Sequence, residues 1–127
     1  MTKTLKKVMT VDDSASIRMM VQFTLKDLGY EILMASNGKE ALEKLTNIKM
    51  QKIDLLITDF NMPELNGVGL VKKVRELPEY RFIPIIMLTT EFQPEKKFEG
   101  RSAGVSSWLV KPFKPEQLVT VVKRMLG

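Results

Sequence analysis

Three carboxylates directly follow apolar runs in this chain of 127 residues. Asp12 and Asp13 come after the run that ends at Val11, and Asp59 comes after the run that ends at Thr58. The chain has only five aspartates, so most of them stand at such places. Neighbouring carboxylates can bind a hard cation through oxygen, and a single carboxylate can also act as a nucleophile.

A pair of hydroxyls and an amine follow two further apolar runs. Thr89 and Thr90 come after one of these runs, and Lys111 comes after the other, whereas one remaining run ends in Ser36. A single polar residue after an apolar run is ordinary, because loops lie in water. Acids, hydroxyls and an ammonium after four of the five runs indicate a common site.

The elements that must position these residues alternate along the whole chain. Short apolar runs predict strands at residues 5–11, 31–35, 53–58, 84–88 and 108–110. Apolar positions with helical spacing predict helices after the caps Ser14 and Asn37, at 15–28 and 38–48, and further helices at 68–77, 94–103 and 115–125. The helix at 94–103 is the weakest, because its apolar stripe is thin and Gly100 interrupts it at a cost of about 1 kcal/mol relative to Ala.

Five strands that alternate with five helices predict an α/β fold with a parallel sheet covered on both faces. Five units are too few to close an eight-stranded barrel, so we expect an open, doubly wound sheet. Such sheets form their sites beyond the carboxyl ends of the strands, which is where the acids, hydroxyls and lysine fall. The length predicts one domain spanning residues 1–127.

Composition excludes several classes of function. The chain has no Cys and no His, which excludes disulfides, thiol nucleophiles, Ser-His hydrolases and metal sites built on these side chains. No apolar run approaches the ~20 residues of a membrane span, and no secretory leader precedes Asp12, so a cytoplasmic location is expected. The net charge is +5, but the lysines are dispersed without interleaved aromatics. This favours a solvated surface over a nucleic-acid or membrane partner.

The charges of the predicted site point to its chemistry. Three carboxylates and one ammonium sum to −2, and a divalent cation compensates such a cluster. Mg²⁺ fits oxygen ligands best, and a carboxylate nucleophile with Mg²⁺, a lysine and a hydroxyl makes a phosphoryl-transfer site. Asp59 is the best nucleophile, because its strand should be central. Asn61, two residues later, cannot shuttle a proton as a phosphatase would require, so we expect a persistent acyl phosphate and no turnover enzyme.

Four motifs carry a resemblance to a known family. The chain resembles the receiver domain of bacterial two-component response regulators, most closely the stand-alone chemotaxis regulators of the CheY type. That resemblance implies a flavodoxin-like fold with strand order 2-1-3-4-5. It covers essentially the whole chain and rests on Val11-Asp12-Asp13-Ser14, Thr58-Asp59-Phe60-Asn61-Met62-Pro63 with Asn66-Gly67, Leu88-Thr89-Thr90-Glu91, and Trp108-Leu109-Val110-Lys111-Pro112-Phe113.

The resemblance implies a role for each site residue. Asp59 is the expected phosphoacceptor and a histidine kinase the expected donor. Asp13 and Asp59 are expected to bind Mg²⁺ directly, Asp12 largely through water, and Asn61 through its backbone carbonyl. Lys111 is expected to contact the phosphoryl group and to precede a cis peptide bond to Pro112.

The resemblance also implies a switch. Thr89 would bond the new phosphoryl oxygens and Trp108 would rotate into the vacated space, while Thr90 and Glu91 tune the site. The face formed by the fourth helix, fifth strand and fifth helix would then change its affinity for partners. Two residues depart from many relatives, which carry Tyr or Phe in place of Trp108 and a small residue in place of Thr90.

Three outputs remain open from the sequence. A monomeric, diffusible regulator would bind the flagellar motor switch and could be served by a separate phosphatase. Alternatively, the chain is a phosphorelay intermediate or phosphate sink, or a receiver excised from a DNA-binding regulator. Basic residues near the expected output face predict an acidic partner with apolar anchors. They are Lys96, Lys97, Arg101, Lys114, Lys123 and Arg124.

Overall fold

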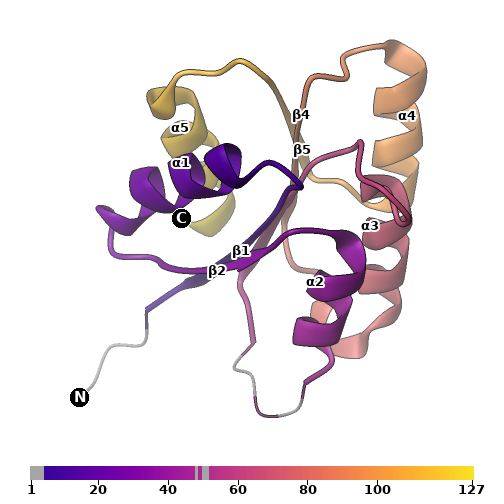
Figure 1. Cartoon of the computed structure of the whole chain (residues 1–127), viewed down its shortest axis with the longest axis horizontal. Coiled ribbons are helices and arrows are strands. Elements are labelled where there is room, and N and C mark those ends of the chain that lie inside the picture. Colours follow the sequence, from indigo (N-terminus) through magenta and orange to yellow (C-terminus); the bar gives the residue numbers. More distant parts are fainter. Residues whose placement is uncertain (1–4, 48, 50–51) are drawn as a thin grey trace.

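A five-stranded parallel sheet lies between two layers of helices in the computed structural model, which describes residues 5–47, 49 and 52–127 (Figure 1). The strand order is β2-β1-β3-β4-β5, which confirms the predicted doubly wound topology. The elements are β1 (Lys7–Val11), α1 (Ala15–Lys26), β2 (Glu31–Ala35), α2 (Gly38–Leu45), β3 (Leu55–Thr58), α3 (Gly67–Glu76), the short 3₁₀ helix η1 (Pro78–Tyr80), β4 (Ile85–Thr89), α4 (Pro94–Ala103), β5 (Ser107–Val110) and α5 (Pro115–Leu126).

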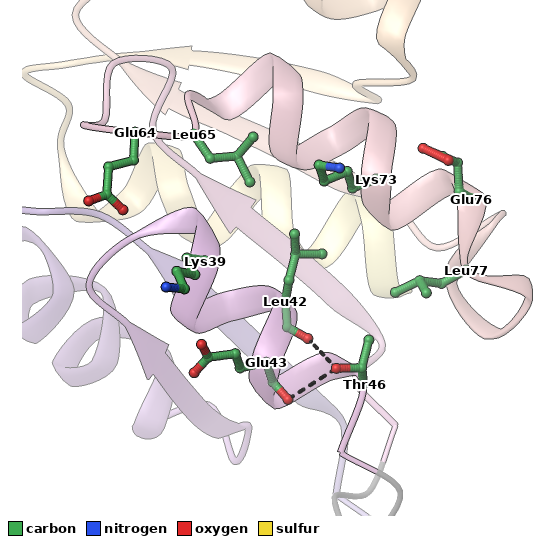
Figure 2. A pocket seen from close by; sticks show the side chains of 9 residues that line it. All are labelled: Lys39, Leu42, Glu43, Thr46, Glu64, Leu65, Lys73, Glu76 and Leu77. Atoms are coloured by element: carbon green, nitrogen blue, oxygen red, sulfur yellow. Dashed lines mark hydrogen bonds between the residues drawn. The ribbon is translucent and has the colours of Figure 1, made fainter.

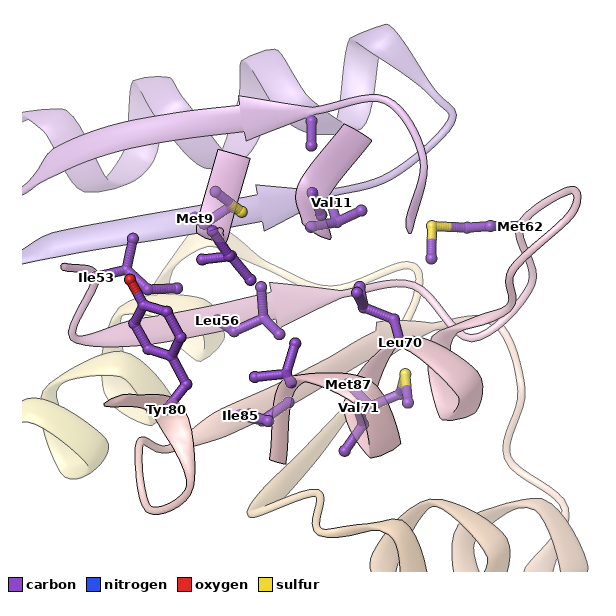
Figure 3. Packing of buried hydrophobic residues seen from close by; sticks show 14 of the residues in the cluster. Met9, Val11, Ile53, Leu56, Met62, Leu70, Val71, Tyr80, Ile85 and Met87 are labelled. Atoms are coloured by element: carbon purple, nitrogen blue, oxygen red, sulfur yellow. The ribbon is translucent and has the colours of Figure 1, made fainter. Parts of the chain in front are cut away.

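The two helical layers bury opposite faces of the sheet. Helices α1 and α5 cover one face, where Val21 and Leu118 join the strand residues in one apolar cluster. Helices α2 and α3 cover the other face, where Val71 packs with Leu56 and Met87 (Figure 3). Because both faces are covered, every residue of β1, β3 and β4 is buried, which explains why their sequences are mostly apolar.

The strand register brings the predicted site residues to one edge. Val11 pairs with Thr58, so the residues that follow them, Asp12 and Asp59, leave the sheet side by side. In the same way Thr89 pairs with Val110, and the Lys111 N–H donates to the Thr89 carbonyl at 2.8 Å. The carboxyl ends of four neighbouring strands therefore deliver their polar residues to a common place.

Side chains start three of the helices, and two of these starts flank the acids. Ser14 Oγ accepts from the N–H of Ile17 at 3.4 Å, and Asn66 Oδ1 accepts from the N–H of Gly69 at 2.8 Å. Asn37 caps α2 as the sequence predicted. By contrast, α4 begins at Pro94 with no side-chain cap and buries only Gly100, in agreement with its expected weakness.

Several predicted boundaries were wrong for local reasons. Strand β3 begins at Leu55 and not at residue 53, because the Asp54 carboxylate accepts from the Lys7 N–H at 2.9 Å and ends the regular ladder. Helix α1 ends at Lys26 and not at residue 28, because the chain tightens into i→i+3 bonds before Gly29, whose φ is +86°. The other strand limits shift by one or two residues: β1 begins at Lys7, β4 spans Ile85–Thr89 and β5 begins at Ser107. Helix α2 ends at Leu45, and its predicted inner residue Ile48 lies outside the described residues.

None of the helices described here has the length and apolar character needed to cross a membrane.

Candidate functional site

Three aspartates form an acidic cluster at the carboxyl edge of the sheet. Asp12, Asp13 and Asp59 each place a carboxylate oxygen within 4.8 Å of the others. Asp12 is 2% exposed and Asp59 is 8% exposed, whereas Asp13 lies at the surface. The structure therefore brings together the three acids that the sequence singled out.

Lys111 reaches the cluster from the end of β5. Its Nζ lies 2.8 Å from Asp12 Oδ2 and 3.4 Å from Asp59 Oδ2. The Lys111–Pro112 peptide bond is cis, as the family resemblance implied. With all four groups ionised, one ammonium faces three carboxylates, so the cluster keeps a net negative charge.

Burial governs the protonation of Asp12. Removal from water raises the pKa of its carboxyl above the ordinary value, and hydrogen bonds from Lys111 Nζ and the Ser14 N–H oppose that rise. Asp59 is oriented by its own loop, because its Oδ1 accepts from the N–H groups of Phe60 at 2.7 Å and Asn61 at 3.4 Å. The donor set consists of oxygens alone and carries excess negative charge, which fits a hard divalent cation.

Glu91 connects three other predicted residues. Its N–H donates to Thr89 Oγ1 at 3.3 Å, its carboxylate accepts from Asn61 Nδ2 at 3.0 Å, and its carbonyl accepts from Trp108 Nε1 at 2.8 Å. The sequence marked Glu91 only as a tuning residue. Thr89 is fully buried and is the last residue of β4. The strand was predicted to end one residue earlier, at Leu88. Thr90, which follows it, is exposed.

Trp108 is half-buried and packs inward. Its ring centroid lies 6.0 Å from that of Phe60 at an interplanar angle of 51°. Lys96 Nζ lies 5.4 Å from the centroid of the same Phe60 ring, a cation–π distance. Phe60 was not predicted as a site residue, although its position directly after Asp59 was a usable signal.

Gly67 is a second residue whose role the sequence did not show. It begins α3, and its N–H donates to the Phe60 carbonyl at 2.8 Å. A Cβ at this position would lie 2.1 Å from the Asp59 carbonyl oxygen, so only glycine lets α3 start this close to the acid. The Asn66-Gly67 pair indicated a turn in the sequence, but not this approach.

The open space beside the acids is a shallow depression of about 440 Å³, lined by Asp13, Asn61, Met62, Pro63 and Asn66. A wider groove of about 650 Å³ lies between α2 and α3 (Figure 2). Its floor is apolar and its rim mixes acids and lysines. The lining residues are Lys39, Leu42, Glu43, Thr46, Glu64, Leu65, Lys73, Glu76 and Leu77. None of the predicted site residues lines this groove, so the chemistry belongs to the depression at the acids.

A doubly wound five-stranded sheet with an acidic cluster, a lysine and a threonine at its carboxyl edge defines the receiver class of α/β proteins. The chain belongs to the response regulator receiver domain family, which matches residues 8–123. It is therefore a protein of two-component signalling.

Similar proteins place it near chemotaxis regulators. It is 46% identical to chemotaxis protein CheY1 of Helicobacter pylori over 122 residues, covering 95% of this chain and 97% of that protein. It is 43% identical to the CheY homolog of Campylobacter jejuni, covering 95% and 92% of the two chains. The crystal structure of Vibrio cholerae chemotaxis protein CheY4 superposes with a TM-score of 0.90 at 49% identity, covering 96% of this chain and 99% of that one.

Proposed function

We propose that this protein is a phosphoacceptor switch of chemotaxis, in which Asp59 receives a phosphoryl group from the phosphohistidine of a histidine kinase. The observation that carries the proposal is the acidic cluster with Lys111 Nζ 2.8 Å from Asp12 and 3.4 Å from Asp59. Two-component family membership and the CheY names of its relatives support the donor and the pathway.

In the proposed transfer an Asp59 carboxylate oxygen forms a bond to phosphorus as the phosphorus–nitrogen bond of the donor breaks. The electron pair of that bond stays on the imidazole nitrogen, which takes a proton from solvent. The N–H groups of Phe60 and Asn61 hold the Asp59 carboxylate in position through Oδ1. Lys111, already beside Asp59 Oδ2, balances the charge of the phosphoryl oxygens.

The same proposal includes Mg²⁺. Asp13 and Asp59 would bind it directly, Asp12 through water and Asn61 through its backbone carbonyl. When bound, the ion neutralises charge on the phosphoryl oxygens. The oxygen-only donor set and its excess negative charge support this assignment.

We infer that the chain modifies itself and does not turn over a substrate. Asn61 stands two residues after Asp59 and its amide donates to Glu91 at 3.0 Å. An amide cannot exchange a proton with water as a carboxylic acid does, so hydrolysis of the acyl phosphate lacks a general base at this position.

The proposed output is binding of a flagellar motor switch protein by the α4-β5-α5 face of a cytoplasmic monomer. Phe98, on α4, is 74% exposed and lies one helical turn before the exposed Arg101, and Phe92, in the loop before α4, is 67% exposed. Aromatic anchors with basic neighbours suit an acidic partner with apolar anchors. A synthetic motor-switch peptide should therefore bind the phosphorylated form more tightly, and less tightly as salt rises. Equal affinity of the phosphorylated and unphosphorylated forms would favour a phosphorelay intermediate or phosphate sink instead. An affinity that does not change with salt concentration would contradict the assignment of an acidic partner.

The fluorescence of Trp108, the one tryptophan of the chain, tests the function directly. Mg²⁺ is titrated first and acetyl phosphate is added second, and the same series is run on the matched variant Asp59→Asn. Intact-protein mass spectrometry measures the fraction of phosphoprotein at each stage. We expect a response to Mg²⁺, then a second response and a phosphoryl mass increment that Asp59→Asn lacks. No phosphoprotein in the wild-type protein would refute the proposed function.

A further inference from the structure

Gly100 is the one fully buried position of helix α4, whose remaining residues are exposed or half-buried. A Cβ built on Gly100 would lie 2.6 Å from Trp108 Cζ3, and 3.5 Å from both Trp108 Cη2 and Val105 Cγ2. A carbon cannot occupy a place 2.6 Å from another non-bonded carbon, so one of the two must shift. Gly100, which lowers the helix propensity of α4, is therefore also the residue whose missing side chain leaves room for the Trp108 indole.

The indole is fixed on its other sides as well. Nε1 donates to the Glu91 carbonyl at 2.8 Å, and the ring packs against Phe60. Phe60 directly follows Asp59 and donates its N–H to the Asp59 carboxylate at 2.7 Å. Trp108 thus lies between the residue next to the proposed phosphoacceptor and the backbone of α4.

We propose that Gly100 is a positioning residue matched to Trp108: its missing side chain forms the seat of the indole, so that the position of α4 and the conformation of Trp108 depend on each other. Cζ3 and Cη2 belong to the six-membered ring of the indole, which lies to one side of the Cβ–Cγ axis, a place that the single ring of Phe or Tyr does not occupy in the same rotamer. Tryptophan at position 108 and glycine at position 100 therefore compensate each other in volume.

A consequence for signalling follows, and this part rests on the proposed function. An indole that leaves its seat opens a gap against α4, whereas an indole that stays in its seat holds α4 in place. The last turn of α4, which contains Gly100, is also held from α3, because Arg75 Nη2 donates to the Gly104 carbonyl at 2.6 Å and the Gly104 N–H donates to the Gly100 carbonyl at 3.1 Å. Movement of Trp108 on phosphorylation is therefore transmitted to the part of α4 around Gly100.

The test compares Gly100→Ala, Trp108→Phe and the double variant, with Ser102→Ala on the exposed side of the same helix as control. In the wild-type background Gly100→Ala should expel the indole. We expect a red-shifted tryptophan emission, stronger quenching by acrylamide and a lower thermal midpoint by circular dichroism. In the Trp108→Phe background the same change should raise the thermal midpoint, because alanine favours the helix once the clash is gone. Ser102→Ala should leave emission and quenching unchanged.

The change in thermal midpoint caused by Gly100→Ala should be negative in the wild-type background and positive in the Trp108→Phe background. A general loss of packing would not reverse this sign. Unchanged emission and quenching in Gly100→Ala would overturn the pairing, and so would an equal loss of thermal stability in both backgrounds. Acetyl phosphate with Mg²⁺ then tests the coupling: the emission change should be smaller in Gly100→Ala than in wild type, although intact mass shows phosphoprotein in both. An equal emission change would overturn the coupling. Failure of the wild-type protein to become phosphorylated would refute the proposed function and leave the result on the pairing standing.

Discussion

Arg75 joins three segments at the end of the sheet opposite the acids, and we expect its replacement by methionine to destabilise the protein strongly. Nη1 donates to the carbonyls of Tyr80 at 3.1 Å, Arg81 at 3.0 Å and Ile83 at 2.6 Å. Nη2 donates to the Gly104 carbonyl at 2.6 Å. One guanidinium therefore holds η1, the entry to β4 and the end of α4 against α3.

The expected magnitude follows from these bonds. A hydrogen bond from a charged donor contributes about 1.5–3 kcal/mol. Nη1 has two hydrogens for three acceptors and Nη2 serves Gly104, so three bonds are made at full strength. Water can replace the guanidinium at the exposed Arg81 and in part at the half-buried Ile83 and Gly104, so we count a net loss of about two full bonds. Burial lowers the pKa of Arg75, which shows that desolvation of the cation offsets part of the gain. We therefore expect Arg75→Met to lower the free energy of unfolding by about 2–4 kcal/mol.

Urea unfolding followed by circular dichroism measures this loss, with an unchanged m-value expected. Lys72→Met, at an exposed position of the same helix, is the matched control and should change the free energy by less than about 0.5 kcal/mol. Arg75→Lys should recover only part of the loss, because a single ammonium cannot span the acceptors. If Arg75→Met behaved like Lys72→Met, the bonds to the four carbonyls would contribute nothing net, and the assignment of Arg75 as the anchor of α4 would be wrong.

Three further predictions concern the loops beside the acids. Glu64 has a φ of +69°, a conformation that strains most side chains other than Gly and Asn. Glu64→Asn should therefore raise the free energy of unfolding, measured by urea unfolding, by up to about 1 kcal/mol, and a decrease would contradict this. Asn66→Ala removes the cap of α3 and should lower the same quantity by about 1 kcal/mol, and no change would mean that the 2.8 Å bond to the Gly69 N–H is replaced by water without loss. Thr90→Ala should change the rate at which phosphoprotein decays, because the exposed Thr90 stands beside Thr89; equal decay rates by intact mass would count against it.

The composition of the candidate site could be predicted because parallel strands share an edge. Once Asp12, Asp59, Thr89 and Lys111 are assigned to strand ends, the topology alone brings them together, and the register of Val11 with Thr58 completes the alignment. The continuous apolar runs likewise predicted the buried strands, since helices cover both faces of the sheet.

Contacts made through loops could not be predicted in this way. The three hydrogen bonds of Glu91 depend on the path between β4 and α4, which no periodicity specifies. The role of Gly100 depends on the size of the Trp108 side chain, which packs against it. In the sequence alone, Gly100 cannot be told apart from a glycine that only weakens its helix. The end of α1 and the start of β3 were likewise decided by turn and side-chain bonds that compete with regular structure.

The close approach of Gly67 to Asp59 sets the length of the segment between them. The Gly67 N–H closes the segment onto the Phe60 carbonyl at 2.8 Å, and the start of α3 fits against Asp59 only at this position. An insertion or deletion here would displace either the acid or the helix, whereas the exposed Pro63 can be exchanged. Diversification of this segment, in nature or in a directed library, is therefore fixed in the number of residues and open only at exposed positions that neither cap α3, bond Glu91 nor adopt a positive φ.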